Sequence, residues 1–159
     1  MRFLAQFFSV VFHPLLMPTY AFALYIAANP YLFAGYDVAA TRAISLFGRD
    51  FALTLKGFEI LKVFTLTAFF PAITIALMIA LRLASDADLK NRQERILPFV
   101  AVGFFYIWAF WVYRATFDFA LYQAVLLGAA ASIFIALIIT VALRFKISIH
   151  ASGVGGLVA

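Results

Sequence analysis

The chain has no cysteine and few charged residues. The lack of cysteine among its 159 residues excludes disulfides and thiolate ligands to a metal. Only 12% of the residues are charged, whereas 67% are hydrophobic, which is more apolar than a soluble core of this size requires. We therefore predict a membrane protein, and in such a protein each of the few polar clusters needs an explanation.

Three apolar runs, at residues 63–81, 96–113 and 119–143, are long enough to cross a bilayer of about 30 Å at about 1.5 Å per residue. A fourth, at residues 3–28, is interrupted by His13-Pro14 and Pro18, where the prolines remove amide donors, so it either spans or enters and returns. We predict an all-α transmembrane helix bundle with no sheet. Residues 1–159 would form a single membrane domain that ends at the start of a further helix.

The connection over residues 29–62 allows two interpretations. Apolar residues at steps of three and four, with basic residues between them, favour a helix lying in the membrane interface, although Gly48 and Gly57 weaken it. The alternative is an irregular linker. We interpret His13, in an apolar segment ahead of a proline, as a structural histidine at a helix break.

The third apolar run and its exit are rich in aromatic residues, and tryptophan and tyrosine favour the headgroup level. The turn that holds Arg114 and Asp118 should therefore mark one membrane face. In the last run, residues 128–132 are all small, which predicts close helix contact there.

The last fourteen residues combine a base, a hydroxyl, an imidazole and three glycines at the end of a membrane segment. Lys146, Ser148 and His150 occupy every second position, and three residues without side chains follow, Gly153, Gly155 and Gly156. A Ser-x-His pair followed by glycines is suited to holding a phosphate, with free amides at the start of a helix near His150.

A second polar cluster lies at residues 85–98. Lys90, Arg92 and Arg95 can converge on an anion, and Arg92 and Arg95 share one helix face, while Pro98 suits the first turn of a helix. The alternative is a solvated loop whose bases meet lipid headgroups. Because two spans separate this cluster from the terminal one, Arg95 and His150 should emerge on the same membrane face, where one site could hold both.

These residues resemble the type 2 phosphatidic acid phosphatase superfamily, membrane enzymes that hydrolyse lipid phosphates and pyrophosphates without a metal. The resemblance is closest to a divergent bacterial branch and covers nearly the whole chain. It is carried by three segments: Phe12-His13-Pro14-Leu15-Leu16-Met17-Pro18-Thr19-Tyr20, Lys90-Asn91-Arg92-Gln93-Glu94-Arg95-Ile96-Leu97-Pro98 and Lys146-Ile147-Ser148-Ile149-His150.

The resemblance implies roles for several polar residues of the two clusters. Lys90 and Arg95 would bind phosphate, and the register of the first motif leaves Arg92 as an alternative to Lys90. Ser148 would bind a phosphate oxygen, Lys146 would add charge, and His150 would be the general acid that protonates the leaving group. The chain departs from the family pattern in two places: Ile147 and Ile149 stand where the motif has proline and glycine, and two residues separate Arg95 from Pro98 where the family usually has none.

The family's third motif, which supplies the attacking histidine and an arginine, has no counterpart, since His13 and His150 are the two histidines of the chain. We therefore expect these residues to be an N-terminal fragment of a longer domain. Such a chain would bind phosphate without turnover, whereas the complete enzyme would work through a phosphohistidine. The expected substrate is a lipid phosphate or an isoprenoid pyrophosphate. We expect neither a cofactor nor a nucleic-acid partner.

The resemblance implies a bacterial cytoplasmic (inner) membrane, and the count of basic residues leaves open which face carries the site. The competing hypothesis is a non-enzymatic lipid-binding or scaffold protein whose basic clusters anchor to anionic headgroups. A transporter, suggested by the broken first segment, would need an inverted repeat, and the sequence contains no internal repeat.

Overall fold

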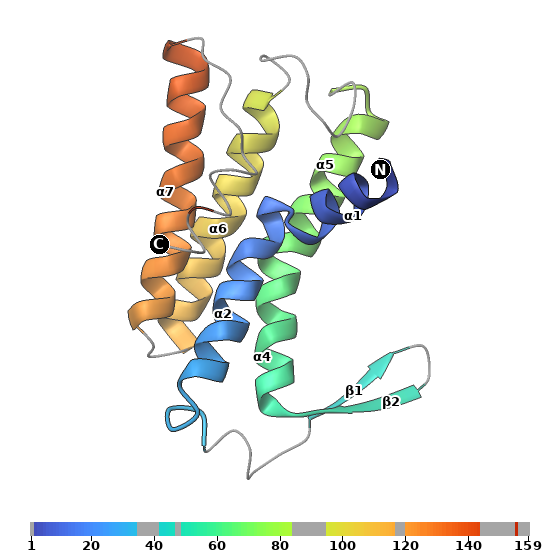
Figure 1. Ribbon diagram of the computed structural model, residues 1–159, viewed down its shortest axis with the longest axis vertical. Helices are drawn as coiled ribbons and strands as arrows, with labels where there is room; N and C mark the ends of the chain where they lie inside the picture. The colour runs from blue at the N-terminus through green and yellow to red at the C-terminus, as the bar shows by residue number, and fades with distance from the viewer. Residues whose placement is uncertain are drawn as a thin grey trace.

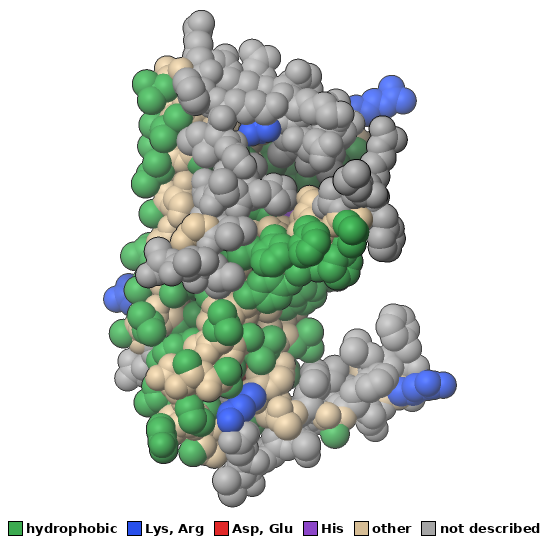
Figure 2. All heavy atoms as spheres, viewed as in Figure 1, with side chains coloured by type: hydrophobic (Ala, Val, Ile, Leu, Met, Phe, Trp, Pro, Cys, Tyr) green, Lys and Arg blue, Asp and Glu red, His purple; other side chains and the backbone are tan. Residues whose placement is uncertain are grey.

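The protein is an integral membrane helix bundle. A computed structural model describes residues 2–34, 42–46, 49–83, 95–116, 120–143 and 155. Within them, four helical segments are long and apolar enough to cross a membrane, and these are Phe7–Ala28, Leu55–Ala80, Ile96–Ala115 and Ala120–Ala142. The predicted helix bundle is confirmed, and apolar side chains cover much of its described surface (Figure 2).

The described elements follow in this order: α1 (Arg2–Val11), the 3₁₀ turn η1 (Pro14–Leu16), α2 (Met17–Ala28), β1 (Arg42–Leu46), β2 (Arg49–Leu53), α4 (Leu55–Phe64), the π-helical turn η2 (Thr65–Phe69), α5 (Phe70–Ala80), α6 (Ile96–Thr116) and α7 (Ala120–Ala142). The end of α5, the start of α6 and the end of α7 lie at one end of the bundle, uppermost in Figure 1, which we call the upper end. The end of α2 and the start of α4 lie at the lower end.

The first apolar segment is broken where the sequence predicted. α1 ends at Val11, and Pro14 begins η1 with His13 as its N-cap. The Nδ1 atom of His13 accepts a hydrogen bond from the amide of Leu15 at 3.3 Å, which supplies an acceptor for one of the free amides at the new helix start. The structural role predicted for His13 is therefore confirmed. Beyond this break α1 points away from the direction of α2 (Figure 1).

A proline also shapes the second span. Pro71 lacks the amide that would continue the hydrogen-bond ladder of α5, and its ring would crowd an ordinary α-helical turn before it. The chain widens there into η2, in which the amide of Phe70 donates to the carbonyl of Thr65, five residues back. The span stays helical while it accommodates a buried proline.

The connection before the second span contains paired strands, so the predictions of an interfacial helix and of no sheet were wrong for this segment. β1 and β2 form an antiparallel hairpin with Arg42 opposite Leu53 and Leu46 opposite Arg49. Only Phe47 and Gly48 separate the strands in sequence, a length and composition typical of hairpins. The bilayer argument against strands does not apply here, because the hairpin precedes the candidate span that begins at Leu55.

α6 and α7 pack closely, and two of the five small residues that we predicted take part: Ala130 is buried in a cluster with Val102 and Tyr106 of α6, and Ala129 packs against that cluster. A side chain at Gly128 would meet nothing within 4 Å, and Ala131 and Ser132 are exposed, so of the five only Ala130 is fully buried. The close approach occurs at Gly103 of α6, where a Cβ atom would lie 2.7 Å from the ring of Phe134 on α7. Small residues permit such contact only where they face a partner.

α5 ends in a Schellman motif with an arginine at the position that favours glycine. The amide of Leu83 donates to Met78 and the amide of Arg82 donates to Ile79, and Arg82 has a φ of 60°.

Because an L-residue is strained in this left-handed conformation, we expect Arg82→Gly to raise the free energy of unfolding by about 0.5–1 kcal/mol. The Arg82 side chain is exposed, so little packing is lost. Unfolding of both proteins in mixed micelles measures the difference. Arg82→Ala is the control that removes the same side chain without relieving the backbone, and a gain of equal size in Arg82→Ala would contradict the explanation.

Candidate functional site

Most of the predicted phosphate site lies outside the described residues. Lys90, Arg92, Lys146, Ser148 and His150 fall there, so their proposed roles stay predictions. Arg95 is the predicted ligand that the structure describes.

Arg95 immediately precedes α6, and only 7% of it is exposed. Arg49, Arg82 and Arg114 are all exposed. An arginine that only anchors to lipid headgroups should extend outward, as these three do. Arg95 is instead buried at the upper end of the bundle, and Pro98 and Phe99 that follow it are buried too. Pro98 lies in the first turn of α6, as we predicted from the sequence.

The two sequence clusters are attached to the same end of the bundle. α6 runs downward from Arg95 and α7 returns to the upper end, where it reaches Ala142 (Figure 1). The prediction that a helical hairpin returns the chain to its starting face is thus confirmed for the ends of the helices. His150 follows Ala142 by eight residues in sequence.

A second polar cluster lies near the lower end, and the sequence did not reveal it. Glu59 and Lys62 are one helical turn apart on α4, and both carboxylate oxygens of Glu59 lie near Lys62 Nζ, at 2.9 Å and 2.7 Å. The hydroxyl of Tyr113 on α6 lies 3.3 Å from the Glu59 carbonyl and 3.4 Å from its carboxylate. Lys62 Nζ also lies 5.1 Å from the centre of the Tyr113 ring, within reach of a cation–π contact.

This cluster is built at the start of a capped helix. The hydroxyl of Thr54 accepts from the amide of Gly57 at 3.1 Å and so begins α4 ahead of Glu59. The side chains of Glu59 and Lys62 are 12% and 27% exposed, so the ion pair is largely removed from solvent. The signal in the sequence was an acid and a base three residues apart after a capping threonine, which we had assigned to the polar linker.

Further hydroxyl groups occupy the bundle interior. Those of Thr19 and Thr67 lie 3.5 Å apart on α2 and η2, and Thr67 also donates to the carbonyl of Val63. Tyr122 of α7 packs edge-on against Tyr113 with ring centres 5.3 Å apart. These two tyrosines lie near the ends of α6 and α7 that meet at the turn and are buried between helices, whereas Trp108 and Trp111 are exposed.

Comparison of the chain with family models, with curated proteins and with solved structures gave no match.

Proposed function

We propose that this chain is part of an integral membrane enzyme that hydrolyses a lipid phosphate or an isoprenoid pyrophosphate. Its active site would lie at the upper end of the bundle, and the enzyme would reside in a bacterial cytoplasmic membrane. The observation that supports the proposal is the burial of Arg95 at the end of the bundle to which α7 returns. Burying a guanidinium costs free energy unless it is paired or binds an anion, so such burial is expected where it has a specific task.

In this proposal, basic side chains stabilise the negative charge that develops on the phosphoryl oxygens. Arg95 and either Lys90 or Arg92 would grip these oxygens, with Lys146 and Ser148 from the other cluster. His150 would donate a proton to the departing alcohol or phosphate. The phosphorus would be attacked by a further histidine, which the family resemblance places in a third motif, and no metal would take part.

Binding of dodecyl phosphate to the protein in phosphatidylcholine nanodiscs tests the substrate site. We expect Arg95→Gln to weaken binding about 10- to 100-fold, since a charge-assisted hydrogen bond to phosphate contributes about 1.5–3 kcal/mol. The matched control is Arg82→Gln, which removes the same charge from an exposed position at the same end and should change the affinity less than about twofold. Phosphorus NMR titration measures both.

An equal loss in the two variants would favour the scaffold hypothesis, in which basic residues attract anionic lipid without a defined site. Release of inorganic phosphate by the 159-residue chain, undiminished by His150→Ala, would contradict the assigned role of His150.

A further inference from the structure

α1 differs from the helices of the bundle in having a polar face. In α2, α5, α6 and α7 apolar residues are spread around the whole circumference. In α1 the polar residues Arg2, Gln6 and Ser9 lie four and three residues apart, so they share one face, and every other residue of this helix is apolar. A wide apolar face beside a narrow polar one is typical of a helix that lies in the plane of a membrane surface.

The apolar face of α1 is not packed against the bundle. Leu4, Phe7, Phe8 and Val10 are 59%, 54%, 54% and 67% exposed. Apolar side chains form a broad patch in Figure 2 where α1 lies in Figure 1, and α1 runs across the bundle rather than along it. Large apolar side chains that gather on one exposed surface mark a place of contact, and in an integral membrane protein acyl chains supply it.

The bend between α1 and α2 is closed by hydrogen bonds. The carbonyl of Val11, at the end of α1, accepts from the hydroxyl of Tyr20 at 2.9 Å, and the carbonyl of Val10 accepts from the amide of His13 at 3.2 Å. The amide of Leu15 donates to His13 Nδ1. A bend in water could leave such groups to the solvent, whereas within lipid each of them needs a partner from the protein. The bend is therefore suited to lie inside the bilayer, and Tyr20 fixes the direction of α1.

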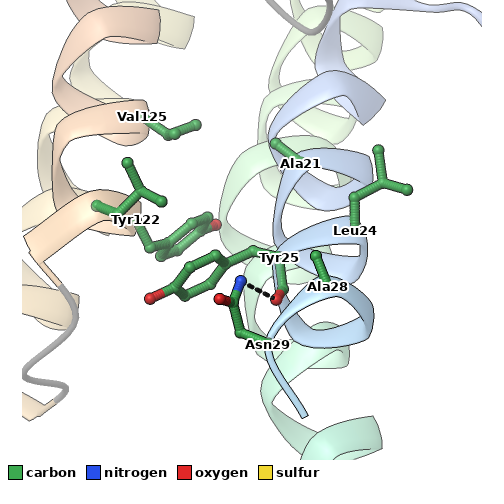
Figure 3. A pocket seen from close by; sticks show the side chains of 8 residues that line it. Ala21, Leu24, Tyr25, Ala28, Asn29, Tyr122 and Val125 are labelled. Atoms are coloured by element: carbon green, nitrogen blue, oxygen red, sulfur yellow. Dashed lines mark hydrogen bonds between the residues drawn. The ribbon is translucent and has the colours of Figure 1, made fainter. Parts of the chain in front are cut away.

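The part of the first segment that runs along the bundle is short. η1 has three residues and α2 has twelve. α2 ends at Asn29, whose side-chain amide donates to the carbonyl of Tyr25 at 3.0 Å (Figure 3). At about 2.0 Å per residue for η1 and about 1.5 Å for α2, the two reach about 24 Å, less than the roughly 30 Å of a hydrocarbon core. With Asn29 at the lower headgroups, the bend lies about 6 Å inside the upper leaflet, a depth typical of in-plane helices.

We propose that α1 is an in-plane membrane anchor whose partner is the upper lipid leaflet. Phe7 and Phe8 lie among the acyl chains, and the face of Arg2 and Ser9 lies toward the headgroups, where a positive charge is favourable beside anionic lipid. The first segment then crosses the membrane through α2 alone, and the N-terminus lies on the same side as Arg95. The anchor holds whether or not the upper end of the bundle hydrolyses a lipid phosphate.

Spin labels on the intact chain in phosphatidylcholine nanodiscs test the proposal. Because the chain has no cysteine, single cysteines can be introduced without removing any. Leu4→Cys and Phe8→Cys place labels four residues apart on the apolar face of α1, and Ile138→Cys and Ala142→Cys are the matched pair on exposed positions of the spanning helix α7. Relaxation by oxygen and by a water-soluble nickel complex, measured by electron paramagnetic resonance, gives the depth of each label. The α1 labels should differ by less than about 2 Å, and the α7 labels by about 6 Å, the rise of four residues.

Two further measurements examine the polar face and the bend. A label at Ser9→Cys should respond more to nickel than the label at Phe8→Cys. Tyr20→Phe removes the bond to Val11 and should raise the mobility of the Phe8→Cys label, whereas Tyr31→Phe, at a position 92% exposed, should leave it unchanged. An equal change in the two tyrosine variants would contradict the role of Tyr20. A depth difference in α1 as large as that in α7, or α1 labels shielded from both oxygen and nickel by a second copy of the chain, would overturn the proposal.

Discussion

Replacement of Gly103 by valine is expected to lower the free energy of unfolding by about 3 kcal/mol, because overpacking a close helix contact forces side chains or backbone to move. At this position even a Cβ atom would lie 2.7 Å from the Phe134 ring. A branched side chain would push α6 away from α7 and disturb the contact that holds the two helices together. Unfolding in mixed micelles, followed by circular dichroism, measures the loss.

Gly128→Val is the matched control. Gly128 lies on the other helix of the same pair, and a Cβ atom there meets nothing within 4 Å, so the change should alter stability by less than about 0.5 kcal/mol. Phe134→Ala, combined with Gly103→Val, should cost less than the sum of the two single changes, since it removes the ring that the valine meets. Strict additivity would show that the glycine acts through something other than this contact.

Glu59→Leu is expected to cost about 2–3 kcal/mol, somewhat less than the removal of one partner from a fully buried ion pair. The change would leave Lys62 Nζ without its two carboxylate contacts and would remove one acceptor from the Tyr113 hydroxyl. The loss is moderated because the Lys62 side chain keeps 27% of its exposure and can extend toward water. Unfolding in mixed micelles again gives the value.

The double variant Glu59→Leu/Lys62→Leu separates an ion-pair effect from a packing effect. With both charges removed, no charge remains to be desolvated, so most of the stability should return. If the double variant were as unstable as Glu59→Leu, the loss of stability would come from lost packing or from the lost Tyr113 contact. It would then not come from the unpaired charge of Lys62.

The membrane spans could be predicted from the sequence because a bilayer imposes length and apolarity along a continuous run. The spans predicted at residues 96–113 and 119–143 became α6 and α7, and the break at His13-Pro14 occurred where the prolines remove donors. The second span begins at Leu55 rather than at residue 63. Its first turns contain Lys56, Glu59 and Lys62, and composition alone could not show that Glu59 and Lys62 neutralise each other.

Features that depend on which helix faces which were harder to predict. The sequence contained Gly103, Gly128 and the tyrosines of α6 and α7, but neither the rotation of each helix nor its neighbours could be deduced from it. Gly128 was therefore wrongly chosen as a contact, and the burial of Tyr122 between helices was not predicted. The hairpin was missed because its apolar residues fit two patterns. Between Ala40 and Phe58 they recur at steps of three and four, as in a helix, but within Arg42–Leu46 apolar and polar residues also alternate, as in a short strand.

The π-helical turn η2 contains one residue more than an α-helix would need over the same path, since Phe70 bonds five residues back to Thr65. A residue turns an α-helix by about 100°. The side chains of the two halves of this span are consequently out of helical register. The face of α4 that carries Glu59 and Val63 does not continue at 3.6 residues per turn into α5, which begins at Phe70. Deletion of one residue at this turn would therefore rotate the distal half of the span by about 100° and present a different set of its side chains to lipid, while the span stays helical.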